Sequence, residues 1–304
     1  MKKTLLLSAV FLLGFTACDI KEDRDDCPGG ETRIRVYAEK FQHVEGAGIP
    51  ANSEAQFNAR LETMNFYLYK DGDLVEQGLL NVSTITAQTY DFVYPSLTYG
   101  DYSLVLLGNT TNNMPLTRKS DVPDRDLVYP GAERTEDYFT DRFDFKVENR
   151  SDTTFVTQLK RVQGVVRFNF INIPAYITGI EVDLDELSSH YHLGGSYTDE
   201  YTFSRLLPEG FERDEQNNHS YSILAFPTLE NERTSWRVKL YRDGDDLPYY
   251  DQIVQTDLHL LRNQLLDLTM NFGSGGGTGE FSFHVNLDEQ WDGWHDVGGP
   301  VMNQ

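Results

Sequence analysis

The sequence contains little cysteine, and the short motifs that mark common catalytic sites are missing from it. Cys18 and Cys27 are the two cysteines among 304 residues, too few for a fold held by several disulfides or for a zinc site. The serine turn of hydrolases, the phosphate-binding glycine loop and the His-Glu-x-x-His motif are all absent. We therefore expect no catalytic residue, no cofactor and no metal.

Positive charge is also scarce. Lysine and arginine number 26 against 48 acidic residues, which gives a formal net charge of −22. A surface of this sign repels nucleic acid and anionic lipid headgroups. We therefore expect no nucleic-acid partner, and attachment to a membrane would require an apolar group rather than a basic patch.

Two patterns leave metal binding open as an alternative. His190 and His192 would share one face of a strand, but no cluster of cysteine or histidine completes a ligand set. Acidic clusters lie at Glu181–Glu186, Asp243–Asp246 and Asp121–Asp126, without the ligand spacing of a calcium-binding helix–loop–helix. A solvated surface is the simpler interpretation of these patterns.

The one sizeable apolar run lies at the N-terminus. Lys2 and Lys3 precede "TLLLSAVFLLGF", and small residues follow it. A basic start, a short apolar core and small residues before a cleavage site are typical of a secretory signal. The run is too short to span a bilayer as a helix. A buried N-terminal helix is the alternative, but no amphipathic pattern continues the run.

The end of this signal, "GFTAC", resembles a bacterial lipobox, in which signal peptidase cuts before a cysteine that receives lipid. Ala17 and Cys18 then flank the cleavage site, with Phe15 at the position where leucine is usual. On this interpretation residues 1–17 are removed and residues 18–30 form a lipidated acidic spacer. Acyl chains, at ~0.8 kcal/mol per buried methylene, would hold Cys18 in a membrane.

Apolar and polar side chains alternate along much of the remaining chain. Met64, Phe66 and Leu68 share one face of "TMNFYLYK". The same period of two recurs in "RIRVYAEKF" from Arg33, "VVRFNF" from Val165, "SWRVKLY" from Ser235 and "LDLTMNF" from Leu266. A period of two with one apolar face predicts half-buried antiparallel strands.

Asp-Gly turns follow two of these strands, in the similar stretches Leu68–Asp73 and Leu240–Asp245. Both residue types accept the positive φ that tight hairpins require. The similarity of these two stretches is compatible with two related β domains, but the simpler interpretation is that an ordinary hairpin sequence occurs twice. A domain boundary is predicted near Lys160, where a polar stretch gives way to a new strand.

A flexible linker is predicted at Gly273–Gly279, "GSGGGTG". Beyond it, Phe281, Phe283, Val285 and Leu287 alternate with polar residues. This segment is either an ordinary last strand of its own domain or a donor strand that completes the sheet of another subunit by β-addition.

Aromatic residues at outward positions of the predicted strands and tail offer a possible binding surface. They are Tyr67, Tyr69, Tyr241, Trp291 and Trp294. Such residues stack on sugar rings or pack on partner proteins. The simpler interpretation is that they fill the core of a β-sandwich.

The stretch "EDRDDCP" at residues 22–28, after the lipobox cysteine, resembles the start of the FimB-type fimbrial anchor family of the Bacteroidetes fimbrillin superfamily. These are lipoproteins that fix fimbriae to the outer membrane. Residues 65–75, "NFYLYKDGDLV", are similar to the family's first hairpin, and residues 97–109, "LTYGDYSLVLLGN", to its Gly-x-Tyr strand. Residues 159–170, "LKRVQGVVRFNF", are similar to the opening of its second domain.

The resemblance implies an all-β fold of two tandem transthyretin-like antiparallel β-sandwich domains, at residues 31–158 and 159–272, followed by a linker and strand at 273–304. It implies a non-catalytic, surface-exposed lipoprotein of the cell outer membrane, anchored through Cys18, with fimbrial structural subunits as partners. In that superfamily a C-terminal strand of one subunit enters a groove of its neighbour, which favours the segment from Phe281 as a donor. A surface glycan-binding lipoprotein of a nutrient-uptake system is the alternative.

Overall fold

The computed structural model describes residues 29–38, 57–59, 61–110, 116–123, 126–128, 137–148, 150–207, 211–230, 232–244, 246–273 and 282–288. Cys18, Cys27, Phe281, Trp291 and Trp294 lie outside this part of the chain. Nearly all of the described elements are strands, so the all-β prediction is confirmed. The helical turns are η1 (Phe57–Ala59), η2 (Val82–Thr84) and η3 (Lys119–Asp121). Among the described residues, no helix has the length and hydrophobicity to cross a membrane.

The first half of the chain folds into two facing layers of strands. Its strands are β1 (Thr32–Ala38), β2 (Thr63–Lys70), β3 (Asp73–Asn81), β4 (Thr89–Tyr94), β5 (Gly100–Gly108), β7 (Phe139–Val147) and β8 (Thr153–Arg161). One layer has the order β3-β2-β5-β7 and the other β8-β1-β4, and a short pairing of β7 with β8 joins them. Ile34 of β1 meets Leu68 of β2 and Leu104 of β5 in the apolar core between the layers.

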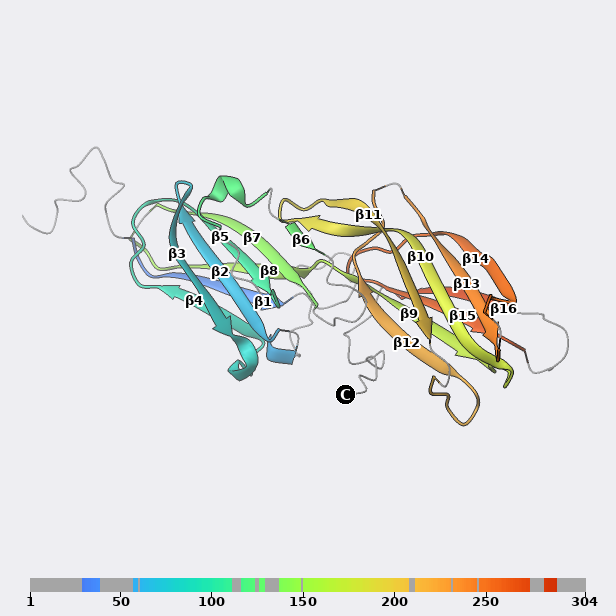
Figure 1. The fold of residues 1–304 in the computed structure, drawn as a ribbon. Helices are drawn as coiled ribbons and strands as arrows, with labels where there is room; N and C mark the ends of the chain where they lie inside the picture. Colours follow the sequence, from blue (N-terminus) through green and yellow to red (C-terminus); the bar gives the residue numbers. More distant parts are fainter. Residues whose placement is uncertain are drawn as a thin grey trace, which may run out of the picture.

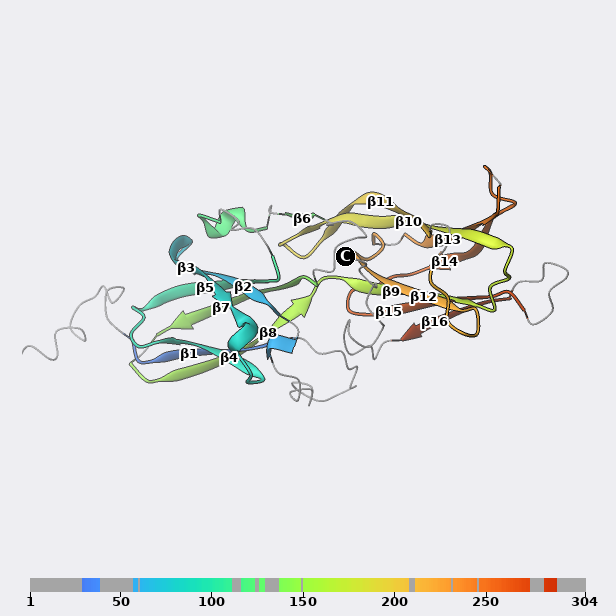
Figure 2. The ribbon, with the colours of Figure 1, turned by 60° about the horizontal axis from the view of Figure 1, so that its bottom comes forward.

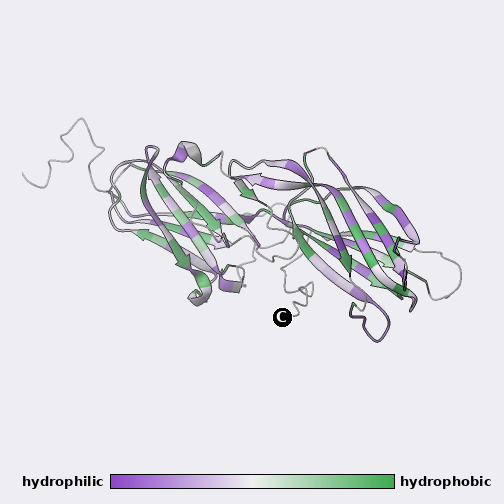
Figure 3. Ribbon diagram, in the orientation of Figure 1, coloured by the Kyte–Doolittle hydropathy of each residue, from purple (hydrophilic) through white to green (hydrophobic). Residues whose placement is uncertain are grey.

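The second half has the same two-layered build. Its strands are β9 (Gly164–Ile171), β10 (Ile177–His192), β11 (Tyr197–Leu207), β12 (His219–Ala225), β13 (Thr234–Arg242), β14 (Tyr250–Leu258), β15 (Leu265–Asn271) and β16 (Ser282–Asp288). The layers are β11-β10-β13-β14 and β12-β9-β15-β16. Trp236 is fully buried at the centre of their shared core, against Phe168. Hydrophobic and hydrophilic residues alternate along these strands (Figure 3), as the period of two predicts.

The two halves repeat one topology. The layer β4-β1-β8 corresponds to β12-β9-β15, with β1 parallel to β8 and β9 parallel to β15. The layer β3-β2-β5-β7 corresponds to β11-β10-β13-β14. By this correspondence Leu68–Asp73 lies in the β2–β3 hairpin, whereas Leu240–Asp245 lies between β13 and β14. The two domains share a topology, but the two similar stretches lie at connections that are not equivalent. Their similarity therefore reflects an ordinary hairpin sequence that occurs twice.

The halves lie end to end and are packed together (Figures 1 and 2). The strand β6 (Asp126–Val128), from the connection between β5 and β7, pairs with the far end of β10 in the other half. The hairpin of β10 and β11 reaches over the first half, where Leu193 joins a cluster with Val105 and Leu107. The change from one half to the other falls between β8 and β9, at residues 162–163. The exact domain limits stay a prediction.

Tyr67 and Tyr69, which are outward-facing on β2, lie in this junction cluster and are buried. The Tyr69 hydroxyl donates a hydrogen bond to the Leu116 carbonyl at 2.8 Å. They are therefore part of a core rather than an exposed aromatic surface, which agrees with the simpler of the two interpretations. Tyr241 is half-buried, and its hydroxyl donates to Glu181 at 2.6 Å.

Candidate functional site

The histidine pair on β10 has ordinary hydrogen-bonding partners. His190 Nδ1 lies 2.8 Å from the Ser189 hydroxyl and 3.2 Å from Asp199 Oδ2, and His192 Nε2 lies 2.9 Å from the Thr198 hydroxyl. Across the described residues, no group of three or more histidine, cysteine, aspartate or glutamate side chains is arranged to hold a metal ion.

The acidic cluster on β10 is part of an ion-pair network on the outer face of the second half. Lys239 Nζ lies 2.7 Å from Glu181 Oε1 and 3.0 Å from Asp183 Oδ2. Hydrogen bonds to Glu181 and Asp183 raise the pKa of the Lys239 ammonium, mainly through Glu181. These carboxylates are thus paired across strands, and they stabilise the sheet surface rather than forming a catalytic pair.

The predicted C-terminal strand is seen as β16, at the edge of its own half. It is antiparallel to β15 over seven residue pairs, from Leu265 opposite Asp288 to Asn271 opposite Ser282. The Phe283 ring packs edge-on against Trp236, with centroids 6.0 Å apart, while Val285 is 36% exposed. The strand is therefore held on β15 of the same chain, partly by an aromatic contact with the core. Its exchange into another subunit stays a prediction.

The corresponding edge in the first half is that of β8. Within the described part of the chain, β8 pairs with β1 along Thr153–Leu159 and with β7 at Lys160 and Arg161. The edge of Thr153–Leu159 that faces away from β1 is therefore open, where β15 carries β16. Val156 on this stretch is 43% exposed. An open edge presents backbone donors and acceptors that a further strand can pair with.

Aromatic rings line the gap between β7 and the open edge of β8. The ring centroid of Phe155 on β8 lies 5.8 Å from that of Phe143 and 5.2 Å from that of Phe145, both on β7. Phe143 and Phe155 are only partly buried. We name this gap between β7 and Thr153–Leu159 the seam. Its apolar side walls match the alternating apolar face of an amphipathic strand.

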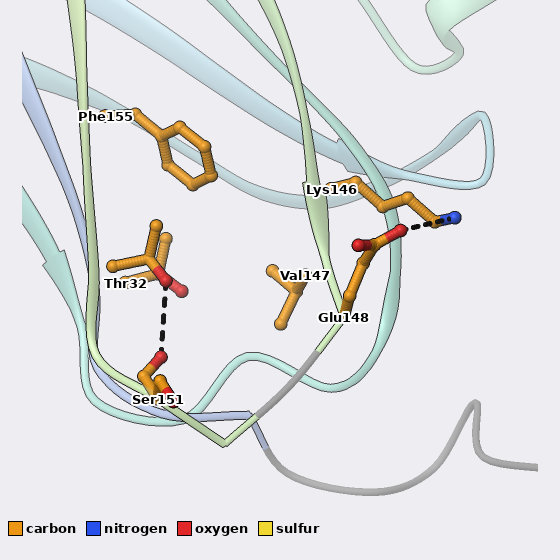
Figure 4. A pocket seen from close by; sticks show the side chains of 7 residues that line it. Thr32, Lys146, Val147, Glu148, Ser151 and Phe155 are labelled. Carbon is orange, nitrogen blue, oxygen red and sulfur yellow. Dashed lines mark hydrogen bonds and ion pairs between the residues drawn. The ribbon is translucent and has the colours of Figure 1, made fainter.

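Two cavities mark the ends of the seam. The first, of about 120 Å³, lies at the start of β8, between Thr32, Val147 and Phe155. Figure 4 shows Phe155 and Thr32 on one side of it and Val147 on the other, with the Lys146–Glu148 ion pair at its rim. The second, which we name the junction cavity, has about 190 Å³ and lies at the other end of β8, against the β10–β11 hairpin.

A carboxyl group lies in the seam near the junction cavity. Asp141 of β7 accepts a hydrogen bond from the Thr157 hydroxyl of β8. Burial raises the pKa of the Asp141 carboxyl, although the bond from Thr157 and the nearby Lys160 lower it. This bond ties the two walls of the seam together across the gap.

The junction between the halves is fixed by a buried ion pair. The Arg161 side chain is 1% exposed, and its Nε and Nη2 atoms lie 2.8 Å from the Asp137 carboxylate. Its Nη1 donates to Asn263 Oδ1 at 3.1 Å. The Gln163 side chain accepts a hydrogen bond from the Tyr138 backbone at 2.7 Å. The end of β8 is therefore held rigidly against the second half.

Sequence reasoning singled out β16 but missed the β8 edge. The residues of β8 read as an ordinary alternating strand, and nothing in them says which edge lacks a neighbour. A comparison of the strand order of the two halves identifies it: among the described residues, β15 is paired along its whole length on that side, whereas β8 is paired there only at Lys160 and Arg161.

Solved structures with a similar fold come from proteins of related bacteria. A candidate adhesin from Bacteroides ovatus is 10% identical with a TM-score of 0.56, over 90% of this chain and 97% of its own. A candidate polysaccharide-binding protein from Bacteroides thetaiotaomicron is 12% identical with a TM-score of 0.55, over 84% and 97%. The tip fimbrial protein Mfa3 from Porphyromonas gingivalis, truncated at its C-terminus, is 12% identical with a TM-score of 0.51, over 85% and 99%. At these identities the likeness establishes the fold alone.

Sequence comparison assigns the family. No curated protein matches the chain. The family model of the fimbrillin-A associated anchor proteins Mfa1 and Mfa2, however, matches residues 24–294. That match covers most of the chain and includes both halves of the fold and β16. The protein therefore belongs to the family of fimbrillin-A associated anchor proteins Mfa1 and Mfa2.

Proposed function

We propose that the protein is a non-catalytic lipoprotein of the cell outer membrane that holds a fimbrium, or a related fimbrial assembly, at the cell surface. The lipid is attached to Cys18, and the acidic spacer of residues 18–30 separates it from β1. Membership of the anchor family supports the fimbrial role. The partners are fimbrial subunits, joined through β-strand addition.

The observation that carries the strand-addition proposal is the difference between the two equivalent edges. In the second half β15 is covered by β16, whereas in the first half the edge of β8 is open within the described residues. A strand that enters the seam gains backbone hydrogen bonds along Thr153–Leu159 and buries the partly exposed Phe143 and Phe155. The segment at Phe281, Phe283, Val285 and Leu287 is the candidate donor strand of this chain.

Glycan capture is the weaker alternative. It would need an exposed aromatic platform, and Tyr67 and Tyr69 are buried in the junction cluster. The similarity in fold to a candidate polysaccharide-binding protein does not change this, because the identity is 12%.

Cross-linking from two matched valines tests the open edge. Val156 on β8 and Val93 on β4 lie on opposite edges of one layer, and each is 43% exposed. We would replace each with cysteine in a Cys27→Ser background and treat fimbriated cells with a short thiol-reactive cross-linker. We expect adducts with a fimbrial subunit from Val156→Cys and few from Val93→Cys. Equal yields from both positions, or adducts from position 93 alone, would contradict strand addition at β8.

A further inference from the structure

The pairing of β16 with β15 gives a direction for any strand that enters the seam. β16 is antiparallel to β15 over its whole length. Because β8 is the counterpart of β15, a strand in the same position would run antiparallel to β8. It would begin opposite Leu159, next to the pairing of Lys160 with Thr140 at the junction between the halves, and end opposite Thr153, next to Thr32. The part of the partner that precedes the strand would therefore lie at the junction.

The junction cavity lies at this entry point. Buried apolar residues from both halves form part of its lining: Val105 and Leu107 on β5, and Leu193 on the β10–β11 hairpin. Thr140, Asp141 and Arg142 of β7 add a polar side to the lining. The aliphatic stem of Lys160 lies at its rim, beside the Asp141 carboxyl. Its volume of about 190 Å³ exceeds the roughly 150 Å³ that a benzene ring needs in a protein cavity. One large apolar side chain would fill it.

The C-terminal strand of this chain cannot supply such a side chain from its flank. In this chain Phe281 belongs to the candidate donor strand itself, and before it the sequence reads Gly273–Gly279 and then Glu280. Glycine, serine and threonine leave the cavity unfilled, and a glutamate carboxylate would pair with Arg142 or Lys160 rather than fill the apolar part of the cavity. A second copy of this chain would thus pair along the seam while leaving the junction cavity empty.

We propose that the junction cavity is a specificity pocket for the partner subunit, which inserts a large apolar residue from the segment just ahead of its donor strand. This inference rests on the proposed strand addition at β8. Burial of a leucine side chain is worth roughly 1.5–3 kcal/mol, which corresponds to about tenfold or more in affinity. The cavity therefore favours a different subunit over a second copy of this chain.

Synthetic peptides that copy residues 274–288 test the proposal on the full-length protein. The parent peptide is compared with three variants, Gly277→Leu, Thr278→Leu and Gly279→Leu, by fluorescence titration. We expect at least one leucine variant to bind about tenfold more tightly than the parent. The gain in affinity should disappear in the protein variant Lys160→Trp, because the indole would cover the mouth of the cavity. Lys160 is exposed at the rim of the cavity, so this substitution leaves the core intact.

The outcomes separate this inference from the proposed function. If the parent and all three variants bind equally well, the specificity pocket is refuted and the strand-acceptor edge stands. If no peptide binds, the acceptor edge is refuted and the inference falls with it. A photoreactive residue at position 279 should label residues 140–142 or 191–193. Labelling near Thr32 instead would reverse the direction of the strand and refute the inference.

Discussion

At the scale of single residues, Arg161 connects the two halves through one buried guanidinium. Its donors reach Asp137 on the first half and Asn263 on the second, and the group lies 5.2 Å from the ring centre of Phe139. A buried charge is tolerated when its partners satisfy its donors, since the desolvation cost is then offset. The planar fork of arginine suits this arrangement better than the point charge of lysine.

We expect Arg161→Ala to lower the free energy of unfolding by about 3–5 kcal/mol, because it leaves the Asp137 carboxylate buried without its partner. Urea denaturation followed by tryptophan fluorescence measures the loss. Arg237→Ala is the control, because Arg237 and Asp251 form a close pair at 2.6 Å on the exposed outer face, where water replaces a lost partner. Similar losses from both variants would show that burial of the Arg161 pair does not matter.

At the scale of elements, β15 and β8 are equivalent strands, but their edges differ in what covers them. β16 contacts the core through one residue in particular, since Phe283 meets Trp236 while His284 is exposed. Its backbone pairs with β15 over seven residue pairs, and the Phe283 ring adds an aromatic contact with the core.

We expect Phe283→Ala to lower the free energy of unfolding of the second half by about 1–2 kcal/mol, less than for a fully buried phenylalanine, because the ring is only partly buried. His284→Ala should change it by less than about 0.5 kcal/mol, since its side chain is exposed. Thermal unfolding of both variants measures the difference. If Phe283→Ala left the protein unchanged, β16 would not be packed on Trp236 in solution.

The sequence was sufficient to predict the strands whose two faces differ. The alternation in "TMNFYLYK", "VVRFNF", "SWRVKLY" and "LDLTMNF" matches β2, β9, β13 and β15. It could not predict that the outward face of β2, which carries Tyr67 and Tyr69, is also covered by other parts of the chain. Tyr67 and Tyr69 are buried in a cluster that joins Leu116 and Val122, from the connection between β5 and β7, to Leu193 of the second half. The open edge of β8 was hidden for the same reason, because an edge is a property of the strand order and not of the strand.

At the scale of the whole molecule, the start of β1 and the junction lie at opposite ends of the first half (Figure 1). The Gly29 amide donates to the Leu97 carbonyl at 2.6 Å, and a Cβ on Gly30 would lie 2.5 Å from the Arg150 carbonyl oxygen. This is the end of the layer where β1 and β8 begin together, Thr32 beside Thr153. A lipid attached ahead of β1 would therefore place the first half next to the membrane and the second half farther out.

The lipid anchor is tested by replacing the cysteine that carries it. We expect Cys18→Ala to move the protein from the detergent-rich to the aqueous phase on Triton X-114 partitioning of cell extracts. The reason is that the variant lacks the thiol that carries the lipid, and the formal net charge of −22 disfavours binding to anionic lipid headgroups. Cys27→Ala is the matched control, nine positions along the same acidic spacer, and should stay in the detergent phase. Unchanged partitioning of Cys18→Ala would mean that something other than a lipid on this residue holds the protein at the membrane.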